Sequence, residues 1–147
     1  MSEMNNPGLV EYATLRDKIR AEKLMRQCRY VEFAALYKRA HVAGMAAGTA
    51  AQPTAMVVTE QRTGEQWHVA DGACGFAWVT VHPATCSFAR WYAKTHPGSR
   101  KAYGGGLTVT WVHDFGQSME RKSAYASAFA DVLSAAGIKA YAGSRMD

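Results

Sequence analysis

The sequence lacks any long apolar run. No stretch approaches the roughly 18 consecutive apolar residues that a membrane-spanning helix needs. The opening residues, MSEMNNPG, also lack the basic start and the apolar centre of a secretory signal peptide. We therefore expect a soluble protein that stays in the cytoplasm where it is made and has no membrane partner.

Cysteine is scarce as well. The three cysteines, Cys28, Cys74 and Cys86, are an odd number without an export signal, which argues for reduced thiols and against a disulfide framework. The spacing of His68, Cys74, His82 and Cys86 matches none of the common structural zinc patterns. We predict neither a metal nor another cofactor.

Acidic residues are missing from one long stretch. None lies between Asp71 and Asp114, although that stretch holds four Lys or Arg residues and three histidines. The whole chain has a net charge of +5 and an isoelectric point near 9.2. A local positive field of this kind favours an anionic partner.

The remaining composition is that of an ordinary globular protein. The chain has 147 residues, of which 48% are apolar and 20% charged, so one hydrophobic core suffices. We expect a single domain over 1–147, with a helical segment over 1–50 and an α/β core over 54–147. The small-residue stretch 43–53 is typical of a helix end followed by a connection.

A long helix is predicted over about 9–42, with Asn6 as its cap and Pro7 in its first turn. Apolar residues recur at close to helical spacing, which predicts an amphipathic helix, either continuous or broken in two near Cys28. These residues are Leu15, Ile19, Leu24, Cys28, Val31, Ala35 and Val42.

The rest of the chain alternates between strand and helix patterns. Strands are predicted at 55–59, 66–70, 74–81, 107–113 and 138–141, and helices at 85–95 and 118–136. The segment 74–81 is apolar on both alternating faces, as is typical of a central, covered strand. The order α-β-β-β-α-β-α-β predicts an α+β fold in which three helices pack on a single mixed β-sheet of about five strands.

One segment combines cations with aromatic rings. Between Phe88 and Tyr103, cations could meet phosphates while an exposed ring stacks on a base, and the following glycines would allow close approach. The alternative is that the rings pack in the core and the glycines form a flexible turn. The candidate binding residues are Arg90, Trp91, Tyr92, Lys94, Arg100, Lys101, Tyr103, Gly104 and Gly105.

Three segments, GFAWVTV, YGGGLTVTWVHDFGQSMERK and AAGIKAYAGSRMD, resemble parts of small proteins encoded by bacteriophages and prophages. The resemblance covers roughly the last 75 residues. It implies a protein made in a bacterial cytoplasm during infection, and it carries over no catalytic or binding residue.

Three functional hypotheses follow. The first is a non-enzymatic accessory protein that binds nucleic acid or a nucleotide phosphate through the Phe88–Tyr103 segment. The second is a protein-interaction module, an inhibitor or adaptor that docks its N-terminal helix on a host or phage protein. The third is a small enzyme that uses Cys86 or His113, with the thiol activated near a helix N-terminus. The many apolar and aromatic residues also suggest a homodimer.

Overall fold

The computed structural model describes the backbone of residues 7–147 and the side chains from residue 14 onward. The element order predicted from the sequence is confirmed, and the fold is α+β. The chain divides into two compact units, residues 1–35 and residues 36–147. Within residues 7–147, none of the three helices combines the length and the apolar character required to cross a bilayer.

Helix α1 (Pro7–Ala50) is a single helix that continues through Cys28 without a break. The prediction of one apolar stripe along it is wrong, because each residue advances about 100° around the axis. Nine residues separate Leu15 from Leu24, so Leu15 and Ile19 lie on nearly the opposite side from Leu24 and Val31. The N-terminal part of α1 therefore carries two apolar sides.

The helical part of the second unit, residues 36–50, extends beyond the predicted helix end. Two glycines let it pack closely, because a Cβ atom at Gly44 would lie 2.7 Å from the Tyr125 ring. A side chain at Gly48 would overlap the Phe115 ring in the same way. The small residues of the 43–53 stretch, which predicted a helix end, therefore allow close packing instead.

The strands form two sheets, not one. Strands β1 (Met56–Thr59) and β2 (Gln66–Val69) pair only with each other as an antiparallel hairpin. The second sheet has the order β4-β3-β5 and is also antiparallel. Its strands are β3 (Gly75–His82), β4 (Leu107–Trp111) and β5 (Lys139–Met146).

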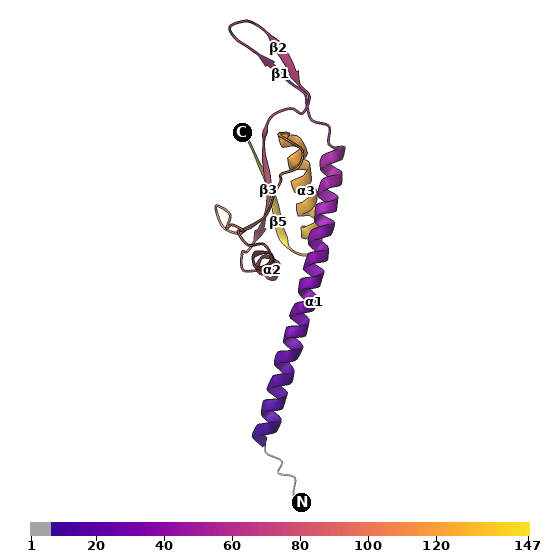
Figure 1. Cartoon of the computed structure of the whole chain (residues 1–147), viewed down its shortest axis with the longest axis vertical. Coiled ribbons are helices and arrows are strands. Elements are labelled where there is room, and N and C mark those ends of the chain that lie inside the picture. The colour runs from indigo at the N-terminus through magenta and orange to yellow at the C-terminus, as the bar shows by residue number, and fades with distance from the viewer. Residues whose placement is uncertain (1–6) are drawn as a thin grey trace, which may run out of the picture. The chain divides into compact units, whose positions relative to one another are not determined.

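The prediction of a single mixed sheet is therefore wrong. The pairing of β3 explains why the first hairpin does not join it. Strand β3 is bonded to β4 along one edge and to β5 along the other. A strand has two hydrogen-bonding edges, so no edge of β3 remains for β2. The first hairpin consequently stands apart from the three-stranded sheet (Figure 1).

The core lies between this sheet and helix α3 (Met119–Ala135), which packs along β3 and β5 (Figure 1). Side chains of β3 alternate between the two faces of the sheet. Ala77, Val79 and Val81 are fully buried on the face that α3 covers, together with Phe129 and Leu133 of that helix. Strand β3 is therefore central, as predicted, but only one of its faces is covered by a helix.

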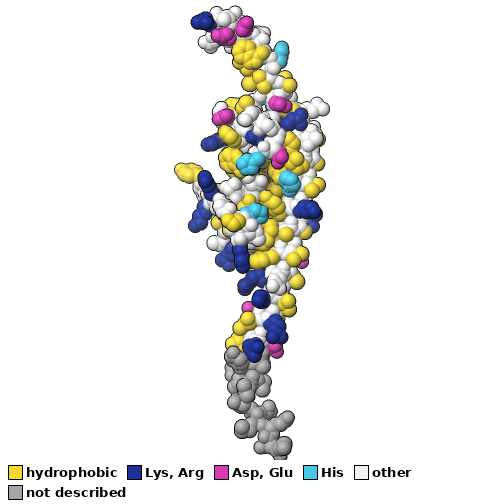
Figure 2. All heavy atoms as spheres, in the orientation of Figure 1, with side chains coloured by type: hydrophobic (Ala, Val, Ile, Leu, Met, Phe, Trp, Pro, Cys, Tyr) yellow, Lys and Arg dark blue, Asp and Glu magenta, His cyan; other side chains and the backbone are white. Residues whose placement is uncertain are grey.

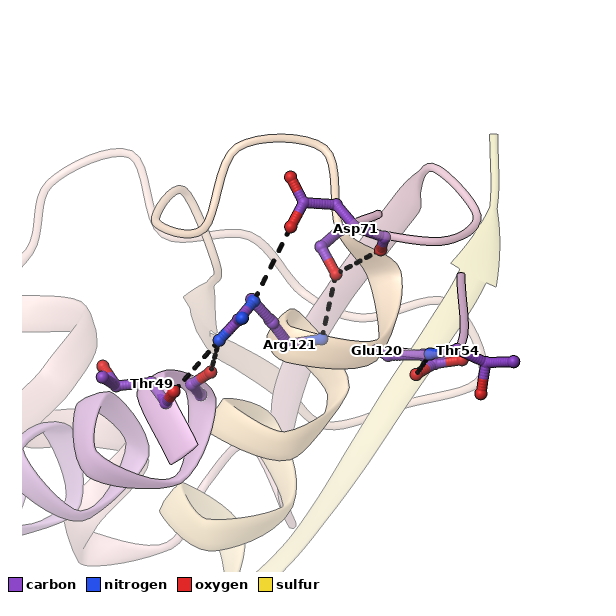
Figure 3. A network of polar contacts seen from close by, with 7 residues as sticks. Thr49, Thr54, Asp71, Glu120 and Arg121 are labelled. Atoms are coloured by element: carbon purple, nitrogen blue, oxygen red, sulfur yellow. Dashed lines mark hydrogen bonds and ion pairs between the residues drawn. The ribbon is translucent and has the colours of Figure 1, made fainter. Parts of the chain in front are cut away.

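A polar network joins the end of α1 to α3 (Figure 3). The Arg121 side chain donates from Nη1 to the carbonyl oxygens of Gly48 and Thr49, both at 3.0 Å, and its Nε lies 3.9 Å from the Asp71 carboxylate. A cation at a helix C-terminus satisfies carbonyls that have no helical partner. Ser118, the N-cap of α3, also donates to the Asp71 carbonyl at 2.9 Å.

Helix α2 (Ser87–Thr95) begins after Cys86, whose Sγ accepts a hydrogen bond from the Ala89 N–H at 3.4 Å. It ends before His96, as expected from the proline that follows. Its Phe88 side chain is fully buried. Cys86 is thus a capping residue in this structure.

We predict that Phe129→Ala lowers the free energy of unfolding by about 3–5 kcal/mol, because it leaves a cavity in the fully buried core. Urea unfolding followed by tryptophan fluorescence measures the change. Leu15→Ala, at a side chain that is 54% exposed, is the control and should change the value by less than about 0.5 kcal/mol. Equal effects of the two substitutions would contradict this assignment of the core.

Candidate functional site

The structure separates the predicted binding residues into exposed and buried sets. Arg90, Lys94, Arg100 and Lys101 are exposed, as are Gly104 and Gly105. Tyr103 projects completely into solvent at 108% relative exposure. Trp91 is only 5% exposed, and half-buried Tyr92 stacks on His96 with ring centroids 4.1 Å apart. Of the three predicted rings, Tyr103 alone presents both of its faces.

Tyr37 of α1 explains why Trp91 and Tyr92 turn inward. Its ring centroid lies 6.2 Å from that of Trp91 and 5.7 Å from that of Tyr92. It also contacts Phe129 of α3 edge to face at 5.4 Å. Tyr37 therefore joins three helices, and the rings of α2 serve this packing.

The tyrosine hydroxyls of this cluster stay protonated at neutral pH. Burial raises the pKa of Tyr125 to about 12, and it also raises the pKa of Tyr37 and of Tyr92. The Tyr125 hydroxyl shares a 2.6 Å hydrogen bond with Nδ1 of His41. The cluster is accordingly a neutral packing element.

A second group of aromatic side chains lies on the sheet face that α3 does not cover. We call this surface the open aromatic face, and its rings are Phe76, Trp78, Trp111 and Tyr141. Trp78 and Trp111 stack with centroids 5.2 Å apart and planes 11° apart, and Phe76 lies 5.8 Å from Trp111. Trp111 is 39% exposed and Tyr141 58% exposed. Large apolar rings are thus presented to solvent side by side.

Strand register creates this face. The β3–β4 pairing places Trp78 directly opposite Trp111, and the β3–β5 pairing places Trp78 opposite Gly143. A Cβ atom at Gly143 would lie 2.6 Å from the Trp78 indole, so the indole rests on the strand where a side chain is missing. Gly143 therefore makes room for the tryptophan pair.

Cations border the rings on β5. Arg145 is opposite Phe76 in the register, and its guanidinium carbon lies 5.4 Å from the Phe76 ring centroid. Lys139 is opposite His82, whose ring contacts Tyr141 at 5.6 Å. Both cations are exposed. The open aromatic face therefore has positive charge along its β5 side.

The loop after α2 extends the same sheet on its β4 side. The N–H of Thr108 donates to the carbonyl of Arg100 at 3.0 Å, and that of Ala102 to Gly106 at 2.9 Å. Residues 100–106 thus form the start of a short hairpin with β4, with Tyr103 in its turn, and we call it the basic hairpin. Arg100 is opposite Thr108, so the two residues share a side of the sheet.

The basic hairpin adjoins the open aromatic face at His82. A Cβ atom at Gly106 would lie 2.7 Å from Cε1 of His82, which in turn contacts Tyr141. In Figure 2, Lys and Arg side chains gather over the part of the second unit that holds α2 and the loop after it. Rings and cations thus form one continuous surface from Arg145 to the basic hairpin.

The residues considered for metal binding do not gather. Within the described part of the chain, no group of three or more His, Cys, Asp or Glu side chains could hold a metal ion. His68 lies on the β1–β2 hairpin, whereas Cys86 caps α2. His113 lies exposed just after β4.

The chain matches no family model, no curated protein and no solved structure. The physical properties of the site must therefore carry any functional conclusion.

Sequence reasoning missed the open aromatic face. The alternation of Phe76 and Trp78 with small apolar residues indicated a strand covered on both faces. The signal that would have found it lies on the neighbouring strands, where Trp111, Tyr141 and Arg145 take matching positions. Recognising that signal requires the register of β3 with β4 and β5, which cannot be predicted from the sequence alone.

We predict that the protein loses stability as the pH rises above 10. An unfolded tyrosine ionises near pH 10, whereas Tyr125 keeps its proton to about pH 12. Between these values the unfolded state binds fewer protons than the folded state, so the free energy of unfolding falls with pH. Urea unfolding at pH 8 and pH 11 measures the change. In Tyr125→Phe the fall should be smaller, and an unchanged fall would contradict the role of Tyr125.

Proposed function

We propose that this protein binds single-stranded nucleic acid across the open aromatic face and the basic hairpin, without catalysing a reaction. The observation that carries the proposal is the stacked Trp78–Trp111 pair on an uncovered antiparallel sheet bordered by cations. Exposed rings stack on bases whatever the sequence, and each stack contributes about 1–3 kcal/mol. Cations beside them supply the contacts to phosphate.

The roles divide by chemistry. Trp111 and Tyr141 stack on bases, because they are the most exposed rings of the face. Arg145 and Lys139 contact phosphates along β5, and Arg100, which shares a side of the sheet with Thr108, does so at the basic hairpin. Lys101, opposite Leu107, adds positive charge beside it. Tyr103, which is fully exposed in the turn of the basic hairpin, stacks on a base that lies beyond the edge of the sheet. Trp78 holds Trp111 in place.

The geometry favours a single strand over a duplex. Outer strands of a three-stranded sheet are about 10 Å apart, a width that suits one nucleic-acid strand. In a duplex the flat faces of the bases are stacked on each other, so rings on a sheet cannot reach them. Such a protein would be an accessory factor in the bacterial cytoplasm, in keeping with the resemblance to phage-encoded proteins.

The test is fluorescence anisotropy with labelled 12-nucleotide DNA and RNA strands, with the matching duplex, and at two salt concentrations. We expect Tyr141→Ala and Trp111→Ala each to weaken single-strand binding by roughly 5–100-fold. The matched control is Trp67→Ala, which removes an indole that is 48% exposed on the β1–β2 hairpin and should leave binding unchanged.

The charge contribution is tested separately. Arg100→Glu/Lys101→Glu should weaken binding and reduce its salt dependence, because fewer counterions are released. Arg62→Glu, on the loop of the β1–β2 hairpin, is the charge control. Equal affinity for strand and duplex, or equal losses in the Trp67 and Trp111 variants, would overturn the proposal. If mononucleotides bound as tightly as the 12-mers, the ligand would be a nucleotide and not a nucleic-acid strand.

A further inference from the structure

One side of α1 has the spacing of a coiled-coil seam. Its residues are separated by three and four positions in strict alternation, which averages the 3.5 residues that pair two helices. We call these residues the α1 seam: Ala21, Leu24, Cys28, Val31 and Ala35. All five are exposed, with Leu24 at 56% and Val31 at 71%. The seam lies wholly in the first compact unit.

Charge around the seam discriminates between partners. Eight Lys and Arg residues lie between Arg16 and Arg39, so this part of the helix is strongly basic. The five positions that flank the seam nevertheless carry no net charge, because Arg20 and Glu32 offset each other. The other three flanking residues are Met25, Gln27 and Ala34. A neutral border does not select an acidic partner, and it does not repel a second copy of itself.

Side-chain size gives the orientation. One set of seam positions is small, namely Ala21, Cys28 and Ala35, and the other holds Leu24 and Val31. In an antiparallel pair two of the three small residues of each helix face Leu24 or Val31, so these layers have similar volumes, and the third small residue lies at the end of the seam. In a parallel pair, small would face small and large would face large. In the same parallel pair, the Asp17 carboxylate, one heptad before Leu24, would face the Asp17 carboxylate of the second copy.

From these three features we infer that two copies of this chain associate through an antiparallel pair of α1 seams. The interface removes the exposed Leu24 and Val31 side chains from water, which is the main driving force for such association. This inference is independent of nucleic-acid binding, because none of the seam residues belongs to the open aromatic face or the basic hairpin.

The test is sedimentation equilibrium of the full chain, which should show a dimer at micromolar concentration. Leu24→Gln/Val31→Gln should raise the dissociation constant by at least about 100-fold, since four buried apolar side chains are lost per dimer. The matched control is Leu15→Gln/Ile19→Gln, which makes the same chemical change on the opposite side of α1. These side chains are 54% and 57% exposed, and the control should remain dimeric.

Orientation is measured with spin labels. Thr14→Cys is labelled in a background in which the seam residue Cys28 is replaced by Ala and Cys74 and Cys86 by Ser, and the distance between the two labels is read by pulsed electron resonance. An antiparallel pair centred on the seam places them roughly 35–45 Å apart at 1.5 Å per residue. A parallel pair would place them within about 20 Å.

The inference would be overturned if the protein remained monomeric at about 100 μM. Equal weakening of the dimer in the Leu15/Ile19 control would also overturn it. A short label distance would overturn the antiparallel arrangement. Tryptophan fluorescence of every variant confirms that the second unit is folded, because its core does not contain the substituted residues.

Discussion

The pairing of β3 along both of its edges is the constraint on which the rest of the second unit depends. Because β4 and β5 occupy these edges, the β1–β2 hairpin cannot pair with β3, and its two strands pair with each other. The same pairing sets the two faces of the sheet. Ala77, Val79 and Val81 meet α3, and Phe76 and Trp78 are directed to the other side. The aromatic surface is thus a consequence of how the core is built.

The two faces of the sheet differ in the kind of residue they present. The covered face has small and medium aliphatic side chains on β3, which let α3 approach closely. The open face has rings, and at Gly143 it lacks a side chain altogether, so that the Trp78 indole can lie on the backbone. An open face built only for solubility would carry short polar or charged residues. Large rings fixed by neighbouring strands and bordered by cations are instead suited to a planar, anionic ligand.

The sequence predicted local structure well and pairing poorly. Helix and strand positions follow from periodicity and from breakers such as Pro97, so the element order was confirmed. The division into two sheets depends on which strands meet, and no local pattern encodes that choice. The prediction of one apolar stripe along α1 is wrong for a geometric reason, because residues nine positions apart lie on opposite sides of a helix.

The candidate site shows the same limit. Arg90, Lys94, Arg100 and Lys101 are exposed, as is usual for charged side chains, which are rarely buried. Which aromatic rings are exposed could not be predicted in the same way. Trp91 of α2 is buried because Tyr37 packs on it, whereas Trp111 of β4 is exposed beside Trp78 on an uncovered face. Burial of a ring is decided by residues distant in sequence.

The two proposed interactions use different units of the chain, and this separation has a physical consequence. The α1 seam lies in the first unit, and the open aromatic face lies in the second. A dimer formed through the seams would carry two open faces on one particle, each with modest affinity of its own. Binding one stretch of a strand raises the local concentration of the next stretch near the second face, so affinity grows without any new contact. Small surfaces of a few stacked bases can then hold a long single strand, provided that the strand can reach both faces.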